Sequence, residues 1–567
     1  MALAAGLLAA GCGDDGGDDG IPDAAVSTPD AGIGAGVVTP FPELYCPGSP
    51  ACATTGDEVL RVGAARANIT PDLQQYETEW TDLDGDSHWD DSEPFVDVNN
   101  NGEFDAVWIP GFDNGRPATA VHDDIWVRAM VFEYGDTRIG LAIVDSVGWF
   151  ANEMDATREL IDPALELDHV IIGSLHIHET PDTVGLWGEE FQESGLDPDY
   201  QQLVRQATAD AVEQAAGRLE AVTMSVAETE TLAGGMAEEY VSDTRDPVVI
   251  DPTMTIVRFA AAAEPARTVA TLVHWSNHPE FAWSRNNEIT ADFVYWIRDI
   301  VENGAAENPT RGLSALTGLG GEVVYVNGAI GGLLTPSRTA PIGPDGQPVP
   351  DHGMPQAEAA GINLGRLALE TITSAQAVVD VTSPDVEFRT GRAYFTVENR
   401  QYHIAALLEI FDRQFFGHDE SRPIDPTNLP FVDSRVSYLR VGPVALLSAP
   451  GELFPETAIG GYDGSHTYGF DFIDPQNPNP PMILDAPEGP YLKDLMRAQG
   501  GVDYPLIAGM TEDFLGYIPP AYDFIVHPEQ PYVEQPEGDH YEETNSVGST
   551  AEAEIVGAMT ELLQWTP

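Results

Sequence analysis

The chain has 567 residues, of which 43% are hydrophobic and 9% aromatic, so it carries enough apolar material for a large folded core. It has 25 basic and 93 acidic residues, a formal net charge of -68. A charge of this size and sign repels phosphate backbones and anionic lipid headgroups, which excludes nucleic acid as an expected partner.

The first twelve residues, MALAAGLLAAGC, form a short apolar run in which small residues precede a cysteine. This run resembles a bacterial lipoprotein signal, in which residues 1–11 would be removed and Cys12 would be lipidated. On this interpretation the protein is exported and anchored to a bacterial membrane, and Gly13 rather than aspartate after Cys12 favours the outer membrane. No Lys or Arg precedes the run, so an ordinary apolar N-terminus is the alternative. No later segment approaches ~18 uninterrupted apolar residues, and we expect no membrane-spanning helix.

Residues 12–57 are rich in Gly, Asp, Ala and Pro, a composition that predicts a flexible tether. Within this segment Cys46 and Cys52 flank a turn rich in Pro and Gly. The two cysteines form either a small disulfide loop, as is common in exported proteins, or two free thiols.

A dense alternation of Asp, Asn and Gly spans residues 82–108, within an expected insertion at residues 78–118. One stretch has oxygen-bearing side chains at positions 1, 3, 5 and 9 of an EF-hand-like loop, with glycine at position 6; these are Asp97, Asn99, Asn101 and Asp105. A preceding stretch has the spacing of positions 1, 3, 5, 9 and 12, but its glycine comes one position early; its residues are Asp82, Asp84, Asp86, Asp90 and Glu93. The spacing predicts one or two structural Ca²⁺ ions in an insertion, and the alternative is a solvated acidic loop.

From residue 58 onward, apolar runs rich in β-branched residues alternate with helical spacing. The stretch 151–165, which opens on an Asn cap, is expected to form a helix between the strands TRIGLAIVDSVGWF and HVIIGSLHIHE. Further helices are expected at 197–219, 291–304, 357–376 and 550–564. This order predicts an α/β fold: a single large domain, residues 58–567, with a layered mixed sheet.

Four separate stretches carry residues that metal sites use. In GSLHIHETP, His176 and His178 share one face if the strand continues, because side chains alternate along a strand, and two imidazoles at a strand end suit Zn²⁺. His278 follows the strand of TLVHWSNHPEF, Glu452 lies in the turn APGELF, and Tyr517 lies in FLGYIPPAYDF. The alternative for each histidine is a buried core residue with a satisfied hydrogen bond.

In this order the stretches resemble the neutral (non-lysosomal) ceramidase family. SLHIHETP is similar to the family's Thr-His-Thr-His-Ser-x-Pro segment, APGELF to its Pro-Gly-Glu-Phe turn, and FLGYIPPAYDF to its Tyr-rich loop. HWSNHP resembles the second histidine strand, and HYEETNSVGSTAEAEIV the closing motif and helix. The resemblance spans about residues 58 to 565 and includes no counterpart of the family's C-terminal sandwich domain.

The resemblance implies one Zn²⁺ ion bound by His176, His278, Glu452 and Tyr517, with His178 as a catalytic histidine near the scissile bond. It places Thr335, in GGLLTP, at the position of an active-site serine, with a turn residue before Pro336 as the alternative. Arg245, in VSDTRDPVV, is a candidate substrate contact, with a surface ion pair as its alternative.

The implied reaction is hydrolysis by metal-activated water of an N-acyl amide bond in a sphingolipid or related acylated amine. The stretch from Glu179 to Asp182 and the loop GGLLTP depart from the family's pattern. Two alternatives therefore stay open: a zinc hydrolase of a different ester or amide, and a non-catalytic surface binding protein stabilised by calcium. The sequence predicts no oligomeric state.

Overall fold

A computed structural model of the chain describes residues 35–53, 56–191, 193–231, 240–334 and 338–567. Two mixed β-sheets form the centre of this part of the chain, one with nine strands and one with six. Most neighbouring strands are antiparallel, while β6 and β7, β10 and β14, and β18 and β20 run parallel. The predicted layered α/β fold with a mixed sheet is confirmed.

The strands of the nine-stranded sheet, in sheet order, are β14 (Glu322–Asn327), β10 (Thr268–Trp275), β9 (Thr253–Ala261), β8 (Glu220–Glu230), β3 (Arg61–Asn68), β5 (Trp126–Tyr134), β6 (Thr137–Val144) and β7 (His169–Ser174), with β15 (Val379–Val381) also paired to β8. Those of the six-stranded sheet are β1 (Gly36–Val37), β16 (Val386–Thr396), β17 (Phe431–Val441), β18 (Val444–Ser448) and β20 (Tyr504–Ala508), with β2 (Leu44–Cys46) also paired to β16. Short pairs are β4 (Ala120–Val121) with β11 (Glu288–Ile289), β12 (Gly304–Ala305) with β13 (Leu316–Thr317), and β19 (Glu452–Leu453) with β21 (Tyr517–Ile518).

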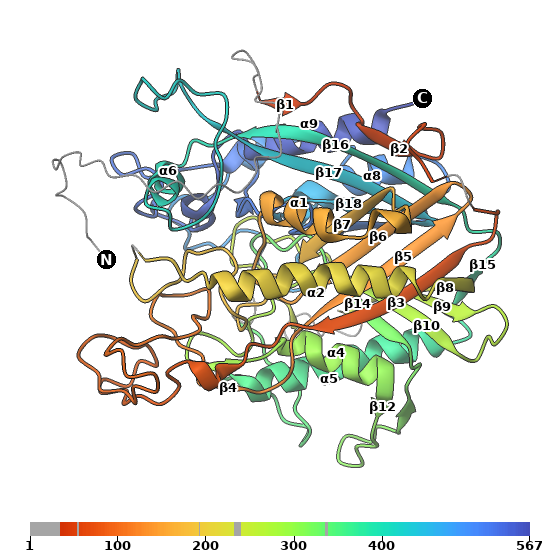
Figure 1. Ribbon diagram of the computed structural model, residues 1–567, viewed down its shortest axis with the longest axis horizontal. Helices are drawn as coiled ribbons and strands as arrows, with labels where there is room; N and C mark the ends of the chain where they lie inside the picture. The colour runs from red at the N-terminus through yellow and green to blue at the C-terminus, as the bar shows by residue number, and fades with distance from the viewer. Residues whose placement is uncertain (1–34, 54–55, 192, 232–239, 335–337) are drawn as a thin grey trace.

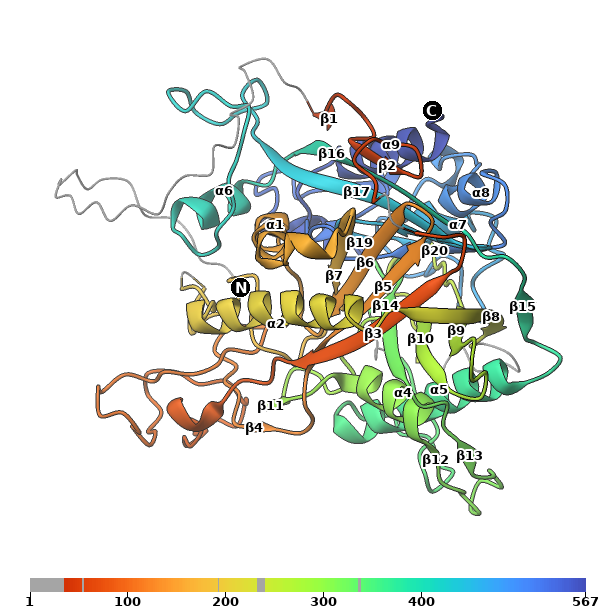
Figure 2. The same ribbon diagram turned by 45° about the vertical axis from the view of Figure 1, so that its right-hand side comes forward.

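Helices cover the outer faces of both sheets. α2 packs on β3 and β5, α4 and α5 pack on each other and on the strands from β8 to β14, and α9 packs on β16 and β17 (Figures 1 and 2). The α-helices are α1 (Ala151–Leu160), α2 (Pro198–Ala216), α4 (Asp292–Asn303), α5 (Met354–Thr373), α6 (Arg400–Leu407), α7 (Pro455–Ile459), α8 (Leu492–Arg497) and α9 (Ala551–Gln564). No helix in the described ranges is long and apolar enough to cross a membrane.

The main hydrophobic core lies between the two sheets and under the helices of the larger one. Phe132 of β5 and Phe259 of β9 contact each other with ring centroids 5.7 Å apart, and Leu439 of β17 belongs to the same buried cluster. Strands buried on both faces explain why the sequence shows continuous apolar runs rather than a regular alternation.

The expected helices form, with boundaries set by local chemistry. α2 begins after Asp197, whose side chain accepts hydrogen bonds from the backbone N–H groups of Asp199 and Tyr200. The predicted Asn cap of α1 is wrong, because α1 begins at Ala151 and the preceding residue provides no side-chain cap. Instead, the carboxylate of Asp513 accepts the hydrogen bond of the Ala151 N–H at 2.9 Å.

The segment predicted as a free tether is structured from residue 35. Gly36–Val37 and Leu44–Cys46 add as antiparallel strands to β16, which satisfies backbone groups that a tether would leave in water. Cys46 and Cys52 form a disulfide bond with a Cα–Cα distance of 5.7 Å, which confirms one of the two alternatives for this pair. Residues 1–34, including Cys12, lie outside the described residues.

Candidate metal centre

The metal-site candidates meet where strands of both sheets end. His176 and His178 follow β7, and His278 lies three residues after the end of β10. Glu452 opens β19 and Tyr517 opens β21, and these two residues are direct partners in the parallel pairing of the two strands. Four distant stretches of sequence therefore converge at one point, as the strand-end prediction requires.

The side-chain atoms at this point are close enough to share one ion. The Nε2 atoms of His176 and His178 are 3.0 Å apart. Oε2 of Glu452 lies 3.2 Å from Nε2 of His278 and 3.4 Å from Nε2 of His176. The three histidines offer ligand atoms that all lie within 4.8 Å of one another, so this cluster can bind a metal ion.

The histidine pair converges by a different geometry from the one expected. β7 ends at Ser174, so the alternation of a continued strand does not place His176 and His178 on one face. His176 instead adopts a left-handed backbone conformation, with φ of 65°. A non-glycine residue in this region is uncommon and strained, and such strain gathers at functional sites.

Backbone carbonyls orient two of the imidazoles. Nδ1 of His176 donates a hydrogen bond to the carbonyl of Val147 at 2.7 Å, and Nδ1 of His278 donates one to the carbonyl of Leu333 at 2.9 Å. With the proton on Nδ1, the Nε2 lone pair of each ring faces the cluster. Metal-binding histidines are commonly fixed in this way.

Burial makes the charged form of each of these groups less favourable when no cation is near. It lowers the pKa of His176 to about 4 and that of His278 to about 3, so both rings are neutral at pH 7, as ligation requires. Burial also raises the pKa of Glu452, and burial together with the charge of Glu452 raises that of Tyr517 well above its ordinary value. The Tyr517 side chain lowers the pKa of Glu452 and so opposes part of this rise. A divalent cation would reverse this balance for the carboxylate and the phenol.

The donor set fits Zn²⁺. Imidazole nitrogen and carboxylate oxygen are its usual ligands, and the three convergent Nε2 atoms and the Glu452 carboxylate supply both types. Each of the four groups is buried or nearly so, and no Lys or Arg of the described residues forms an ion pair with Glu452. A buried carboxylate without a basic partner is a natural place for a cation.

His178 differs from the other two histidines in what faces its second nitrogen. Its Nδ1 has no hydrogen-bond partner in the described chain, and Oε2 of Glu280 lies 3.6 Å from it. Burial and the neighbouring His176 and His278 hold the pKa of His178 well below its ordinary value. A carboxylate behind an imidazole raises the basicity of the ring and orients it toward a metal or a substrate.

A wall contributed by the insertion closes the site over His178. The Phe112 ring lies 5.5 Å from the His178 ring, between centroids, and the buried guanidinium of Arg116 donates to the carbonyl of His178 and to Glu179. Gly111 has φ of 84°, and a Cβ there would lie 2.3 Å from Nδ1 of His178. Only glycine allows this close approach.

Sequence reasoning did not identify Glu280 or Arg116 as site residues. Glu280 stands two residues after His278, and this proximity to a ligand was the signal available in the sequence. Arg116 carries no such signal, because it reaches the site from an insertion 62 residues away from His178.

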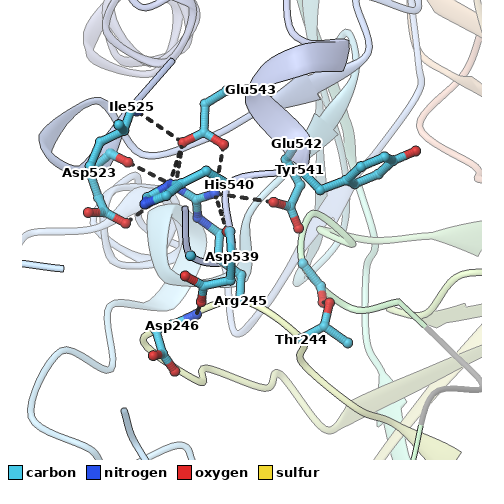
Figure 3. Close-up of polar contacts among 12 residues, drawn as sticks. Thr244, Arg245, Asp246, Asp523, Ile525, Asp539, His540, Tyr541, Glu542 and Glu543 are labelled. Atoms are coloured by element: carbon cyan, nitrogen blue, oxygen red, sulfur yellow. Dashed lines mark hydrogen bonds and ion pairs between the residues drawn. The ribbon is translucent and has the colours of Figure 1, made fainter. Parts of the chain in front are cut away.

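Arg245, the candidate substrate contact, is buried among carboxylates, and its prediction as a substrate contact gains no support from this position. Its side chain is 2% exposed and is surrounded by carboxylates of the segment 523–543 (Figure 3). It donates to both oxygens of Glu543 at 2.8 and 2.9 Å, and to Glu542 at 3.2 Å. These contacts are a buried ion-pair network rather than the surface pair that was the alternative. Thr335 lies outside the described residues.

No protein-family model and no curated protein matches the sequence. Solved structures do match. A neutral ceramidase from Pseudomonas aeruginosa superposes with a TM-score of 0.54 at 15% sequence identity, covering 90% of this chain and 75% of that chain. A ceramidase complexed with C2 matches with a TM-score of 0.54 at 14% identity, covering 89% and 74%. The chain therefore has a neutral ceramidase-like fold.

Proposed function

We propose that the protein is a zinc-dependent hydrolase that cleaves an N-acyl amide bond of a sphingolipid or a related acylated amine. The observation that carries this proposal is the convergence of His176, His278, Glu452 and Tyr517 at the strand ends of a neutral ceramidase-like fold. Zn²⁺ bound there would polarise a carbonyl and lower the pKa of a water molecule to ~7.

The chain's own residues supply the remaining functions. Val147 and Leu333 keep the Nε2 lone pairs of His176 and His278 directed at the site through their carbonyls. His178 is the residue that moves or holds a proton, since Nε2 faces the centre while Nδ1 faces Glu280. Phe112 and the insertion wall exclude water from this side.

A small apolar cavity beside the centre supports a substrate with an apolar group. Phe514 lines it and also lies 5.5 Å from the His176 ring, between centroids, so the cavity begins next to a proposed ligand. Its other apolar lining residues include Phe150, Val184, Leu186, Phe411 and Phe415. An apolar group of the substrate packed against these side chains would leave its polar end near the metal.

A second candidate is a zinc hydrolase of another amide or ester. Two buried carboxylates favour it, because burial raises the pKa of Glu179 to about 8 and that of Glu280 well above its ordinary value, and both lie beside the histidines. A buried carboxyl group whose pKa is raised keeps its proton to higher pH and can donate a hydrogen bond, which favours a polar group near the scissile bond.

One screen separates these functions. Purified protein is stripped of metal, reloaded with Zn²⁺, and assayed on N-acyl sphingoid bases, N-acyl amino acids and simple esters. Zinc-dependent release of fatty acid from the sphingoid bases supports the proposal, and turnover of only the other classes supports the second candidate. Ceramide turnover that persists without zinc refutes the mechanism, and a protein that binds zinc but hydrolyses nothing favours a binding module.

We also propose that the protein is exported and attached through a lipid on Cys12. The Cys46–Cys52 disulfide supports this location, since disulfide bonds persist in oxidising compartments. Labelling of intact cells with a radioactive fatty acid tests the anchor: the natural chain incorporates label and a Cys12→Ser variant does not. Label in both chains would reject Cys12 as the attachment site.

A further inference from the structure

The acidic loop at the start of the insertion lies outside the metal centre. Asp82, Asp84 and Asp86 place carboxylate oxygens within 4.8 Å of one another on the exposed face of this loop. Residues 77–105 contain eleven acidic residues and no Lys or Arg. Within the described ranges, the only ion pair of this stretch is His88 with Asp86. Exposed acidic residues often gather in this way without an ion, so the cluster alone assigns nothing.

A buried carboxylate beside the cluster points to a ligand. Glu93 is 5% exposed, and its Oε1 accepts a hydrogen bond from the Leu83 N–H at 2.6 Å, which fixes the carboxylate next to Asp82. Its Oε2 is buried and has no hydrogen-bond partner in the described chain. Burial and the charges of Asp82 and Asp90 raise the pKa of Glu93. A buried carboxylate oxygen without a donor is unfavourable unless a cation binds it.

The second loop of the insertion provides an internal comparison. Glu77 accepts a hydrogen bond from the Val98 N–H, just as Glu93 does from Leu83 in the first loop. The other oxygen of Glu77, however, accepts from the Asp105 N–H at 3.0 Å. The second loop therefore leaves no buried acceptor without a donor, and the calcium assignment rests on the first loop alone.

The first loop is connected to the wall of the metal centre by direct contacts. Trp89, within the loop, donates its backbone N–H to the Gly115 carbonyl at 2.7 Å, next to Arg116. The Trp89 ring stacks on Phe104 at 4.3 Å in the small core of the insertion. Because this core contains only Trp89, Phe104 and Trp108 as buried residues, it is too small to order the loop by itself.

We infer that Asp82, Asp84, Asp86 and Glu93 bind one Ca²⁺ ion, and that this ion holds Phe112 and Arg116 against His178. Carboxylate oxygens on a flexible loop suit Ca²⁺, which takes six to eight oxygen ligands. The proposal that Ca²⁺ binds at this loop does not depend on the proposed function. An effect of Ca²⁺ on hydrolysis does rest on the proposed function.

Terbium luminescence tests the site without reference to activity. Tb³⁺ replaces Ca²⁺ in such sites and emits when a nearby tryptophan, here Trp89, is excited. Protein depleted of all metal and reloaded with Zn²⁺ alone is titrated with Tb³⁺, and the emission is then displaced with Ca²⁺. The variants are Glu93→Gln and, at an exposed ligand where folding is not at risk, Asp84→Asn. The matched control is Asp91→Asn, which removes the same charge from an exposed residue of the same loop that is not a ligand.

We expect sensitised emission that Ca²⁺ displaces, and affinity at least about tenfold lower in Glu93→Gln and Asp84→Asn, because loss of even an outer partner costs about 10–100-fold. Asp91→Asn should keep its affinity. Absence of emission at millimolar ion concentrations, or an equal loss in the control, overturns the site.

Hydrogen exchange tests the connection to the wall. Addition of Ca²⁺ to the zinc-loaded protein should slow amide exchange in residues 109–117, and the two ligand variants should lose this protection. If Ca²⁺ binds and exchange there is unchanged, the coupling is refuted while the ion site stands. If exchange slows but no substrate is hydrolysed with or without Ca²⁺, the proposed function fails and the calcium site does not.

Discussion

The metal centre and the Arg245 cluster are both buried, polar and assembled from distant segments, yet their hydrogen bonding differs. In the Arg245 cluster a guanidinium lies among the carboxylates, so donors and acceptors face each other. At the metal centre, imidazole lone pairs and a carboxylate face one another with no basic side chain between them. A saturated polar cluster stabilises the fold, whereas acceptors that converge without a donor indicate a cation site.

Removing a proposed ligand gives the largest expected effect. His278→Ala should abolish stoichiometric zinc binding and lower hydrolysis at least about a thousandfold, since the ion supplies several kcal/mol of transition-state stabilisation. Metal analysis and the amide assay measure this. His274→Gln is the matched control, because His274 is buried near the same strand end but bonds to the Ile507 carbonyl. Retention of full zinc in His278→Ala would remove the basis of the proposed ligand set.

Breaking the Arg245 cluster should act on stability instead. Arg245→Met leaves three buried carboxylates without their cation, which should reduce the free energy of unfolding by about 3–5 kcal/mol. The folded fraction should keep its zinc. Thermal unfolding checks the first point and metal analysis the second.

The control for this variant is Arg267→Met, which breaks a pair that is nearly half exposed and should cost at most about 1 kcal/mol. Loss of zinc at an unchanged unfolding temperature in Arg245→Met would mean that the cluster serves the metal centre after all.

Glu280 should have an intermediate effect. Glu280→Gln removes the carboxylate behind His178 and should weaken zinc binding or hydrolysis by about 10–100-fold. A structural role alone would lower the unfolding temperature and leave kcat of the folded enzyme unchanged. Glu280→Asp, which keeps the carboxyl group, should recover part of the loss. Kinetics with separate kcat and KM values, together with a competitive zinc titration, distinguish these outcomes.

The smallest effect concerns pH and a histidine that binds no metal. Burial lowers the pKa of His274 to about 4, with Lys493 adding repulsion and Asp251 opposing it. The unfolded chain binds this proton near pH 6.5, so His274 favours the folded state above pH 6.5 and loses this contribution as the pH falls toward 4. His274→Gln should therefore reduce the loss of stability on acidification by up to about 1.4 kcal/mol per pH unit in this window. Unfolding temperatures measured between pH 7 and pH 5 should show a shallower slope for the variant, and parallel slopes would contradict the assignment.

Local features of the structure could be predicted from the sequence. Helical spacing predicted α2, and the order of short motifs identified the proposed ligands. Contacts between distant segments could not be predicted from the sequence. The N–H of Ala151 at the start of α1 bonds to Asp513, and β1 and β2 form by pairing with β16. Residue type alone could not separate Arg245 from a substrate contact, because the difference lies in the carboxylates that fold around it.

The pairing of Glu452 with Tyr517 has a consequence for how the site assembles. Side chains alternate between the two faces of a strand, so a shift of one residue in either short strand would turn one of the two groups away from the histidines. β19 and β21 each contain two residues, too few to set their own alignment. An ion that binds the oxygens of both side chains at once would therefore favour the correct register of β19 and β21 during folding.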